Sequence, residues 1–232
     1  MNSHIGISPK HYLMALYFLN EYSTEVLNAT KFQCDEKTFR LHSWRVVELL
    51  SKLDFVSWEK RNEGGNQSEV IRMSIDGTDC RIEEQYPFDK KWFSHKFKGP
   101  GIRYEVGVSI NGNIVWVYGG FPCGEWSDLK IAQDAVLELL DDGEKVIADS
   151  GYRGDHRIVT PNGINDSISR IRSILRARHE TVNSRLKSFN VLSHRYRHNL
   201  RKHPLCFHAI ANLIQVQIMV ESPLFNINET HL

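Results

Sequence analysis

The spacing of apolar residues changes from a helical period to a strand period near residue 70. Leucine, valine and aromatic residues recur at helical spacing in Pro9 to Asn20 and in Phe39 to Leu53. A shorter helix is expected within Thr24 to Phe32, and Asp35 is the candidate N-cap of the helix that follows. The first sixty residues are therefore predicted to be helical.

From Val70 onward, apolar and polar residues alternate with a period of two. This pattern predicts strands at Val70 to Ile75, Tyr104 to Ile110 and Ile114 to Tyr118. The last two strands are joined around Asn111-Gly112, a dipeptide that tolerates the positive φ angles of a tight hairpin turn. Three antiparallel strands are expected.

A strand–helix–strand crossover is predicted to follow the hairpin. Ser127 can cap a helix that runs through Leu140, Gly143 ends it, and Lys145 to Ala148 reads as a buried strand. Such a crossover makes the last strand parallel to the sheet. The order predicts an α/β fold, a ribonuclease-H-like mixed sheet flanked by helices, followed by a long helix from about Asn165 to Lys187.

Four segments are expected from these patterns. Residues 1–60 form a helical unit, 61–69 a linker that contains Gly64-Gly65, 70–224 the mixed-sheet core and 225–232 a tail. The helical unit fits a helix-turn-helix, with Lys37, Thr38, Arg40 and Trp44 free to meet a DNA groove; the alternative is a plain helical packing unit.

Composition narrows the class of protein. The 232 residues are 41% hydrophobic, which suffices for a buried core, and the four cysteines contain no CxxC pair that would indicate a zinc ribbon. Met1 to Pro9 lacks the pattern of a signal peptide. The apolar run from Leu205 to Val220 is interrupted by polar residues and is shorter than the roughly 20 residues of a membrane span. An intracellular protein is predicted.

Charge is distributed unevenly, although the net charge is only +1. Glu180 is the only acid between Arg170 and His203, a stretch with ten Arg and Lys residues. Two further acids, Asp76 and Asp149, stand where predicted strands end. Three carboxylates can hold two Mg²⁺ or Mn²⁺ ions, which together cleave a phosphodiester efficiently. The pattern therefore indicates metal-dependent chemistry on DNA.

The local motifs around these acids are more specific than their spacing. They are Asp76-Gly77-Thr78, Asp149-Ser150-Gly151-Tyr152 and a Glu180 segment that ends in Arg185-Leu186-Lys187. A Gly124-x-x-Ser127-Asp128 motif lies between the first two. Together these motifs, over about Ser74 to Leu224, resemble the DDE transposases of the PIF/Harbinger superfamily.

The resemblance implies an enzyme that hydrolyses DNA at the terminal inverted repeats of a transposon and joins the freed 3′ ends to target DNA. Asp76, Asp149 and Glu180 would be its catalytic metal ligands, with Mg²⁺ or Mn²⁺ as cofactor. It also implies a nuclear location, a Myb-like accessory protein and an oligomer assembled on DNA. The alternative is a domesticated, catalytically idle DNA-binding protein that keeps the fold.

Further basic residues are candidates for DNA contact. Lys96, Lys98 and Arg103 can form a basic loop on the phosphate backbone, or one that is merely solvated. Cations close in sequence to the predicted ligands can neutralise phosphates: Arg153, Arg178, Arg185 and Lys187. A helical wheel places Glu180 opposite the apolar side of its helix, so the pattern alone does not turn it towards the sheet.

Overall fold

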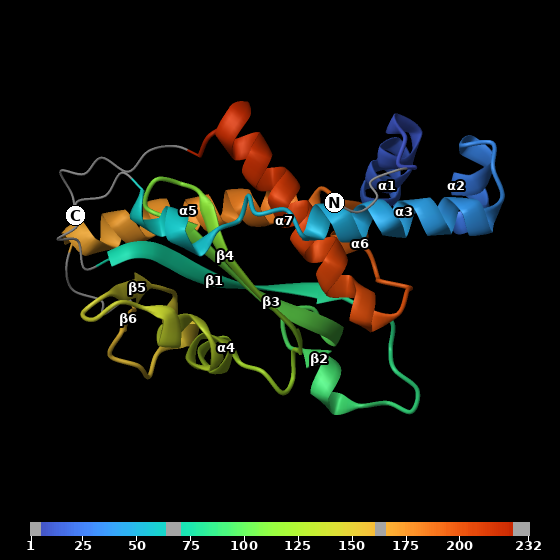
Figure 1. The fold of residues 1–232 in the computed structure, drawn as a ribbon. Coiled ribbons are helices and arrows are strands. Elements are labelled where there is room, and N and C mark those ends of the chain that lie inside the picture. The colour runs from blue at the N-terminus through green and yellow to red at the C-terminus, as the bar shows by residue number, and fades with distance from the viewer. Residues whose placement is uncertain (1–5, 64–70, 161–165, 225–232) are drawn as a thin grey trace.

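A mixed six-stranded sheet flanked by helices forms the centre of the computed structural model, which describes residues 6–63, 71–160 and 166–224 and only the backbone of 166–172 (Figure 1). Its strands are β1 (Ile71–Arg81), β2 (Phe93–Ser94), β3 (Gly99–Ser109), β4 (Ile114–Pro122), β5 (Lys145–Ile147) and β6 (Ile158–Val159). The chain is thus of the mixed α/β class.

The sheet order confirms the predicted topology. β3 pairs antiparallel with β1 on one side and with β4 on the other, and β2 pairs with the beginning of β3. β5 lies parallel to β1, and β6 lies parallel to β5. The order β4-β3-β1-β5-β6, with a hairpin pair first and parallel strands after a crossover, is the predicted ribonuclease-H-like arrangement.

Helices account for most of the remaining described chain. They are α1 (Pro9–Glu21), α2 (Glu25–Lys31), α3 (Glu36–Ser51), α4 (Asp128–Asp134), α5 (Asp166–Lys187), α6 (Asn190–Ser193) and α7 (His203–Val220). Single 3-10 turns are η1 (Trp58–Asn62), η2 (Lys90–Trp92), η3 (Val136–Leu139), η4 (Ser150–Tyr152) and η5 (Leu200–Lys202). The two predicted N-caps are confirmed, because Asp35 accepts from Thr38 N and Ser127 accepts from Lys130 N.

Two apolar layers cover the two faces of the sheet. On one face, residues of α5, α6 and α7 share a core with β3 and with the N-terminal helices α1 and α3. On the other face, α4 and η3 pack on Met73 and Ile75 of β1. Figure 1 shows α1 to α3 grouped at one end of the sheet. Since these helices share the main core, the predicted boundary at residue 60 stays a prediction.

The last helix satisfies the length and hydropathy of a membrane span but packs as a core helix. Within the described residues, Leu200–Val220 is the one stretch that passes this test, and 56% of its apolar window is buried. α7 lies against α3 and β4, and Phe207 is fully buried on Tyr104. Packing therefore accounts for its apolar character.

Three details differ from the sequence-based expectations. β1 continues to Arg81, so Asp76 lies inside a strand and not at its end. The helix predicted from Ser127 to Leu140 breaks at Ala135 into α4 and η3. β6 was not expected. The 225–232 tail and most of the 61–69 linker lie outside the described residues.

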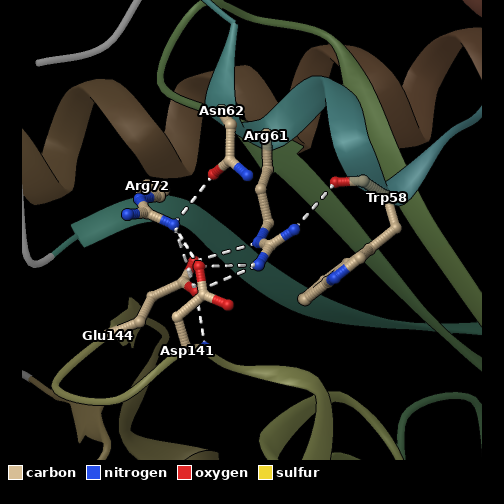
Figure 2. Close-up of polar contacts among 6 residues, drawn as sticks. All are labelled: Trp58, Arg61, Asn62, Arg72, Asp141 and Glu144. Carbon is tan, nitrogen blue, oxygen red and sulfur yellow. Dashed lines mark hydrogen bonds and ion pairs between the residues drawn. The ribbon is translucent and has the colours of Figure 1, made fainter. Parts of the chain in front are cut away.

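A buried ion-pair cluster ties η1 to the sheet (Figure 2). Arg61 and Glu144 are both buried, and Arg61 Nε lies 3.2 Å from Glu144 Oε1. Arg72, at the start of β1, contacts Asp141 at 2.6 Å and Glu144 at 3.7 Å. The Arg61 guanidinium also lies over the Trp58 ring. Because Arg61 and Glu144 are opposite charges in contact, the two side chains can remain buried.

Candidate active site

Asp76 and Asp149 are brought to neighbouring positions by the register of β1 and β5. Ser74 pairs with Ile147 in the parallel ladder. Asp76 lies two residues beyond Ser74, and Asp149 lies two residues beyond Ile147, just past the end of β5. Two strands that advance in parallel therefore carry the two carboxylates to the same level of the sheet.

The two aspartates have different surroundings. Asp76 is half-buried, and its Oδ2 accepts a hydrogen bond from Asn183 Nδ2 at 3.2 Å. Burial raises the pKa of Asp76 to about 6, and the charges of Asp149 and Asp128 add to the rise. Asp149 is exposed and caps η4, where its Oδ1 accepts from Gly151 N at 2.8 Å. Negative charge is thus concentrated at this edge of the sheet.

A third aspartate, Asp128, lies beside this pair. It is the first residue of α4, and its carboxylate lies against Gly77, where an added Cβ would meet Asp128 Oδ1 at 2.2 Å. A Cβ on Gly151 would lie 3.5 Å from Asp128 Oδ2 and 3.0 Å from Asp149 Oδ1. No role was predicted for Asp128, although the Gly124-x-x-Ser127-Asp128 motif marked its position.

Glu180 lies on α5 but does not point at the aspartates in this structure. Its side chain is 67% exposed, and its Oε1 accepts from Arg176 Nε at 3.1 Å, an i,i+4 ion pair. Asn183, three residues further on the helix, is the residue that contacts Asp76. In the described part of the chain, no three His, Cys, Asp or Glu side chains are gathered closely enough to hold a metal ion.

The side of α5 that faces β1 carries a polar stripe at helical spacing. His179 Nε2 lies 2.8 Å from Ser74 Oγ, Asn183 contacts Asp76, and Lys187 Nζ donates to the carbonyl of Asp79. Burial lowers the pKa of His179 to about 4, so the ring is neutral at pH 7. His179 therefore helps to place α5 on the strand that carries Asp76.

The sheet also contains a buried carboxyl, Glu105, that no sequence motif indicated. Glu105 of β3 pairs with Gly77 of β1 in the antiparallel ladder and is fully buried. Burial raises the pKa of Glu105 to about 8, although the hydrogen bond that Trp116 Nε1 donates at 3.0 Å acts to lower the pKa. Neither Glu105 Oε2 nor the buried Tyr152 hydroxyl completes a hydrogen bond of ordinary geometry within the described residues.

Four of the predicted DNA-contacting cations hold groups of the protein itself. Arg103 binds the Asp79 carboxylate through two nitrogens, at 2.7 and 3.0 Å. Burial raises the pKa of Asp79, but the hydrogen bonds from Arg103 and Ser94 hold it below its ordinary value. The other three donate to backbone carbonyls: Arg178 to Ser109 and Ile110, Arg185 to Ser222, and Lys187 to Asp79.

Three other predicted cations are exposed at the surface: Lys96, Lys98 and Arg153. The charge of Lys96 opposes the rise in pKa of both Asp76 and Asp128, which places this lysine near the two carboxylates. Arg153 follows η4 and lies four residues after Asp149. All three side chains are open to solvent and can reach a phosphate.

The predicted groove-reading residues lie along the first turns of α3. Lys37 is exposed, and Thr38 is held by the Asp35 cap. Arg40 is exposed but forms an ion pair with Glu25 of α2. Trp44 is half-buried against Phe18 and His198. Of this set, Lys37 is the side chain most open to a partner.

Comparison with known proteins places the chain in a family. No curated protein matches it in a sequence search. Among solved structures, the crystal structure of a pre-cleavage Mos1 transpososome is 10% identical, with a TM-score of 0.25, and the alignment covers 98% of this chain and 83% of that chain. That TM-score is too low to support an argument. The family model of the DDE superfamily endonucleases matches residues 75–215, which is more than half of the sequence. The chain belongs to the DDE superfamily endonucleases.

Proposed function

We propose that the protein is a divalent-metal-dependent DNA endonuclease and strand transferase of the PIF/Harbinger type. It cleaves DNA at terminal inverted repeats and joins the 3′ ends to target DNA. Membership of the DDE superfamily endonucleases supports the nuclease class. The observation that carries the proposal is the parallel register of β1 and β5, which brings Asp76 level with Asp149.

The donor groups at this edge suit a hard divalent cation. Asp76, Asp149 and the neighbouring Asp128 offer carboxylate oxygens alone, the ligands that Mg²⁺ and Mn²⁺ prefer. Asp76 and Asp149 would hold the metal, with Glu180 as a further ligand. When bound, Mg²⁺ or Mn²⁺ supplies charge stabilisation for the attacking and leaving oxygens of a phosphodiester.

Glu180 must leave Arg176 to serve as a ligand. Their i,i+4 ion pair is exposed at both ends, and such pairs contribute only about 0.3–0.5 kcal/mol. Asn183 shows that the adjacent surface of α5 already touches Asp76, since residues three apart are neighbours on a helix. The cost of turning Glu180 towards the aspartates is therefore small.

Surface cations would position the DNA. Lys96 is close to the acids, and Lys98 and Arg153 are exposed on neighbouring loops, so these three can hold phosphates that flank the scissile one. Lys37, Thr38, Arg40 and Trp44 would contact DNA through the α2–α3 unit, which we propose as a helix-turn-helix. Arg103, Arg178, Arg185 and Lys187 would act mainly by holding the fold that carries these groups.

Double-stranded DNA is the proposed partner, as transposon ends and as target. Joining two ends requires both to be held together, so we propose an oligomer on DNA, with a Myb-like accessory protein for end recognition and a nuclear location. Sedimentation of the protein with end DNA tests the oligomer, since a complex with one protein chain per DNA would contradict it.

The function is tested with a supercoiled plasmid that carries the inverted repeats flanking the gene. Wild type is expected to cut at the repeat ends with Mn²⁺ and not with Ca²⁺ or EDTA, and Asp149→Asn is expected to bind the DNA without cutting it. Asp142→Asn removes an exposed carboxylate away from the site and should cut normally. Salt-sensitive DNA binding without cleavage by wild type would instead indicate a domesticated, idle DNA-binding protein.

A further inference from the structure

The position of Asp128 depends on two glycines that belong to the two acidic motifs. Asp128 Oδ1 occupies the space that a side chain at residue 77 would fill, because an added Cβ there would lie 2.2 Å away. Asp128 Oδ2 lies 3.5 Å from the corresponding point at Gly151. Gly77 follows Asp76 directly, and Gly151 is two residues after Asp149. Because neither position carries a side chain, Gly77 and Gly151 form a cradle with room for the Asp128 carboxylate against both acidic motifs.

A buried hydroxyl with an incomplete hydrogen bond lies near the same acids. The Tyr152 side chain is 1% exposed and its hydroxyl faces the buried Glu105 carboxyl, but within the described residues it completes no hydrogen bond of ordinary geometry. The charges of Glu105, Asp128, Asp76 and Asp149 all raise the pKa of this hydroxyl. A buried hydroxyl without a well-formed hydrogen bond is unfavourable, and a bound ion with its water shell can offset that cost.

We propose that Asp128 is a third acid of the divalent-cation centre, held beside Asp76 and Asp149 by the Gly77–Gly151 cradle. This inference rests on the proposed function, because it assigns a further residue to the same centre. It goes beyond the trio of Asp76, Asp149 and Glu180, and it gives the glycines of both motifs a physical role.

The present arrangement shows what cation binding must change. Asp128 Oδ1 lies 3.4 Å from Arg103 Nη1, while Arg103 keeps its two shorter contacts to Asp79. Asp128 can therefore turn away without leaving the arginine unpaired. The three aspartates do not yet converge on one point, so Asp128 acts after a side-chain rotation or through a metal-bound water.

Mn²⁺ binding to the full-length protein, measured by the electron paramagnetic resonance signal of free Mn²⁺, tests the inference without any DNA cleavage. Asp128→Asn is expected to weaken binding by about 10- to 100-fold, the usual effect of losing a group that supports a metal ligand. Asp149→Asn should weaken it at least as much. Asp142→Asn is the matched control, an exposed acid that should leave the affinity unchanged.

A second variant displaces the carboxylate without removing it. Gly77→Ala puts a Cβ on Asp128 Oδ1 and is expected to weaken Mn²⁺ binding as Asp128→Asn does. In an Asp128→Ala background, the same change should have no further effect. Gly99→Ala is the control in β3, where the nearest atom to the added Cβ is 3.8 Å away. Thermal unfolding of each variant shows whether it is folded.

The outcomes separate the two proposals. If Asp128→Asn and Gly77→Ala bind Mn²⁺ as tightly as wild type while Asp149→Asn does not, the inference is overturned and the proposed function stands. If wild type itself binds no Mn²⁺, the proposed metal centre fails as a whole. Weaker binding in both Asp128→Asn and Gly77→Ala, with both controls unchanged, supports the third acid.

Discussion

Asn183 of α5 donates a hydrogen bond to Asp76 Oδ2 at 3.2 Å, and this contact joins the helix of Glu180 to the strand of the first aspartate. Asn183 Oδ1 is buried and finds no hydrogen-bond partner among the described residues. An amide at this position can donate to a carboxylate without adding charge. Asn183 therefore keeps Asp76 oriented towards α5 and leaves its negative charge available to a cation.

We predict that Asn183→Asp destabilises the metal-free protein, because it places a second carboxylate beside a half-buried one. The free energy of unfolding should fall by about 1–2 kcal/mol at pH 8, since like charges at this distance repel. Urea unfolding in EDTA and in Mn²⁺ measures the effect, and Mn²⁺ should reduce the loss. Ser184→Asp, on the exposed side of α5, is the control. An unfolding free energy of Asn183→Asp in EDTA equal to that of wild type would contradict the prediction.

The Arg61–Glu144 pair makes a separate prediction about stability. Glu144→Gln leaves the buried Arg61 guanidinium without its main partner and should cost about 3–5 kcal/mol of unfolding free energy. Glu138→Gln removes an exposed acid that lies 3.6 Å from Arg157 and should cost less than about 1 kcal/mol. Chemical denaturation compares the two variants. Equal losses would mean that Asp141 and solvent compensate for Glu144.

The order of strands was predictable from sequence because alternation, Asn111-Gly112 and the Ser127 helix are local signals. Gly112 has the positive φ of 86° that the turn requires, and β5 is parallel to β1 as the crossover predicted. The length of β1 was not predictable, since Gly77 and Thr78 read as a strand end. Pairing with β3 extends the strand to Arg81, because the backbone groups find partners there.

The site was predictable only in part, for a related reason. The sequence motifs identified Asp76 and Asp149, and the parallel register of β1 and β5 places them at the same level of the sheet. The orientation of Glu180 and the roles of Arg103, Arg178 and Lys187 depend on which side of an element meets a neighbour. Periodicity showed that Glu180 lies opposite the apolar side of α5, but not that Arg178 is buried with its guanidinium on β3 carbonyls.

A pH dependence of stability is predicted from His203. Burial lowers the pKa of His203 to about 3, and Tyr104 Oη lies 2.7 Å from its Nδ1. The folded protein keeps this ring neutral, while the unfolded chain takes up a proton below the ordinary value of 6.5. Stability from this group is therefore complete above pH 6.5 and falls by about 1.4 kcal/mol per pH unit below it.

The test compares urea unfolding of wild type and His203→Gln at pH 7 and pH 5. The difference between their unfolding free energies should shrink by about 2 kcal/mol at pH 5, because only wild type then loses the contribution. His156→Gln, which changes a histidine whose side chain is 88% exposed, is the control and should differ equally from wild type at both pH values. A constant difference for His203→Gln would show that the ring titrates alike in both states.

Lys96 and Lys187 should differ in what they contribute to DNA binding. Lys187 Nζ donates to the Asp79 carbonyl and lies 3.1 Å from Cys80 Sγ, so Lys187→Ala should lower the unfolding free energy by about 1–3 kcal/mol. Lys96 is exposed, and Lys96→Ala should change stability by less than about 0.5 kcal/mol.

If Lys96 meets a phosphate, its loss reduces the slope of log affinity against log salt by about 0.9. Fluorescence anisotropy on labelled duplex DNA from 50 to 200 mM salt, roughly the range over which this term is large, measures both slopes. We expect Lys187→Ala to keep the wild-type slope, and a smaller slope for Lys187→Ala than for Lys96→Ala would reverse the assignment.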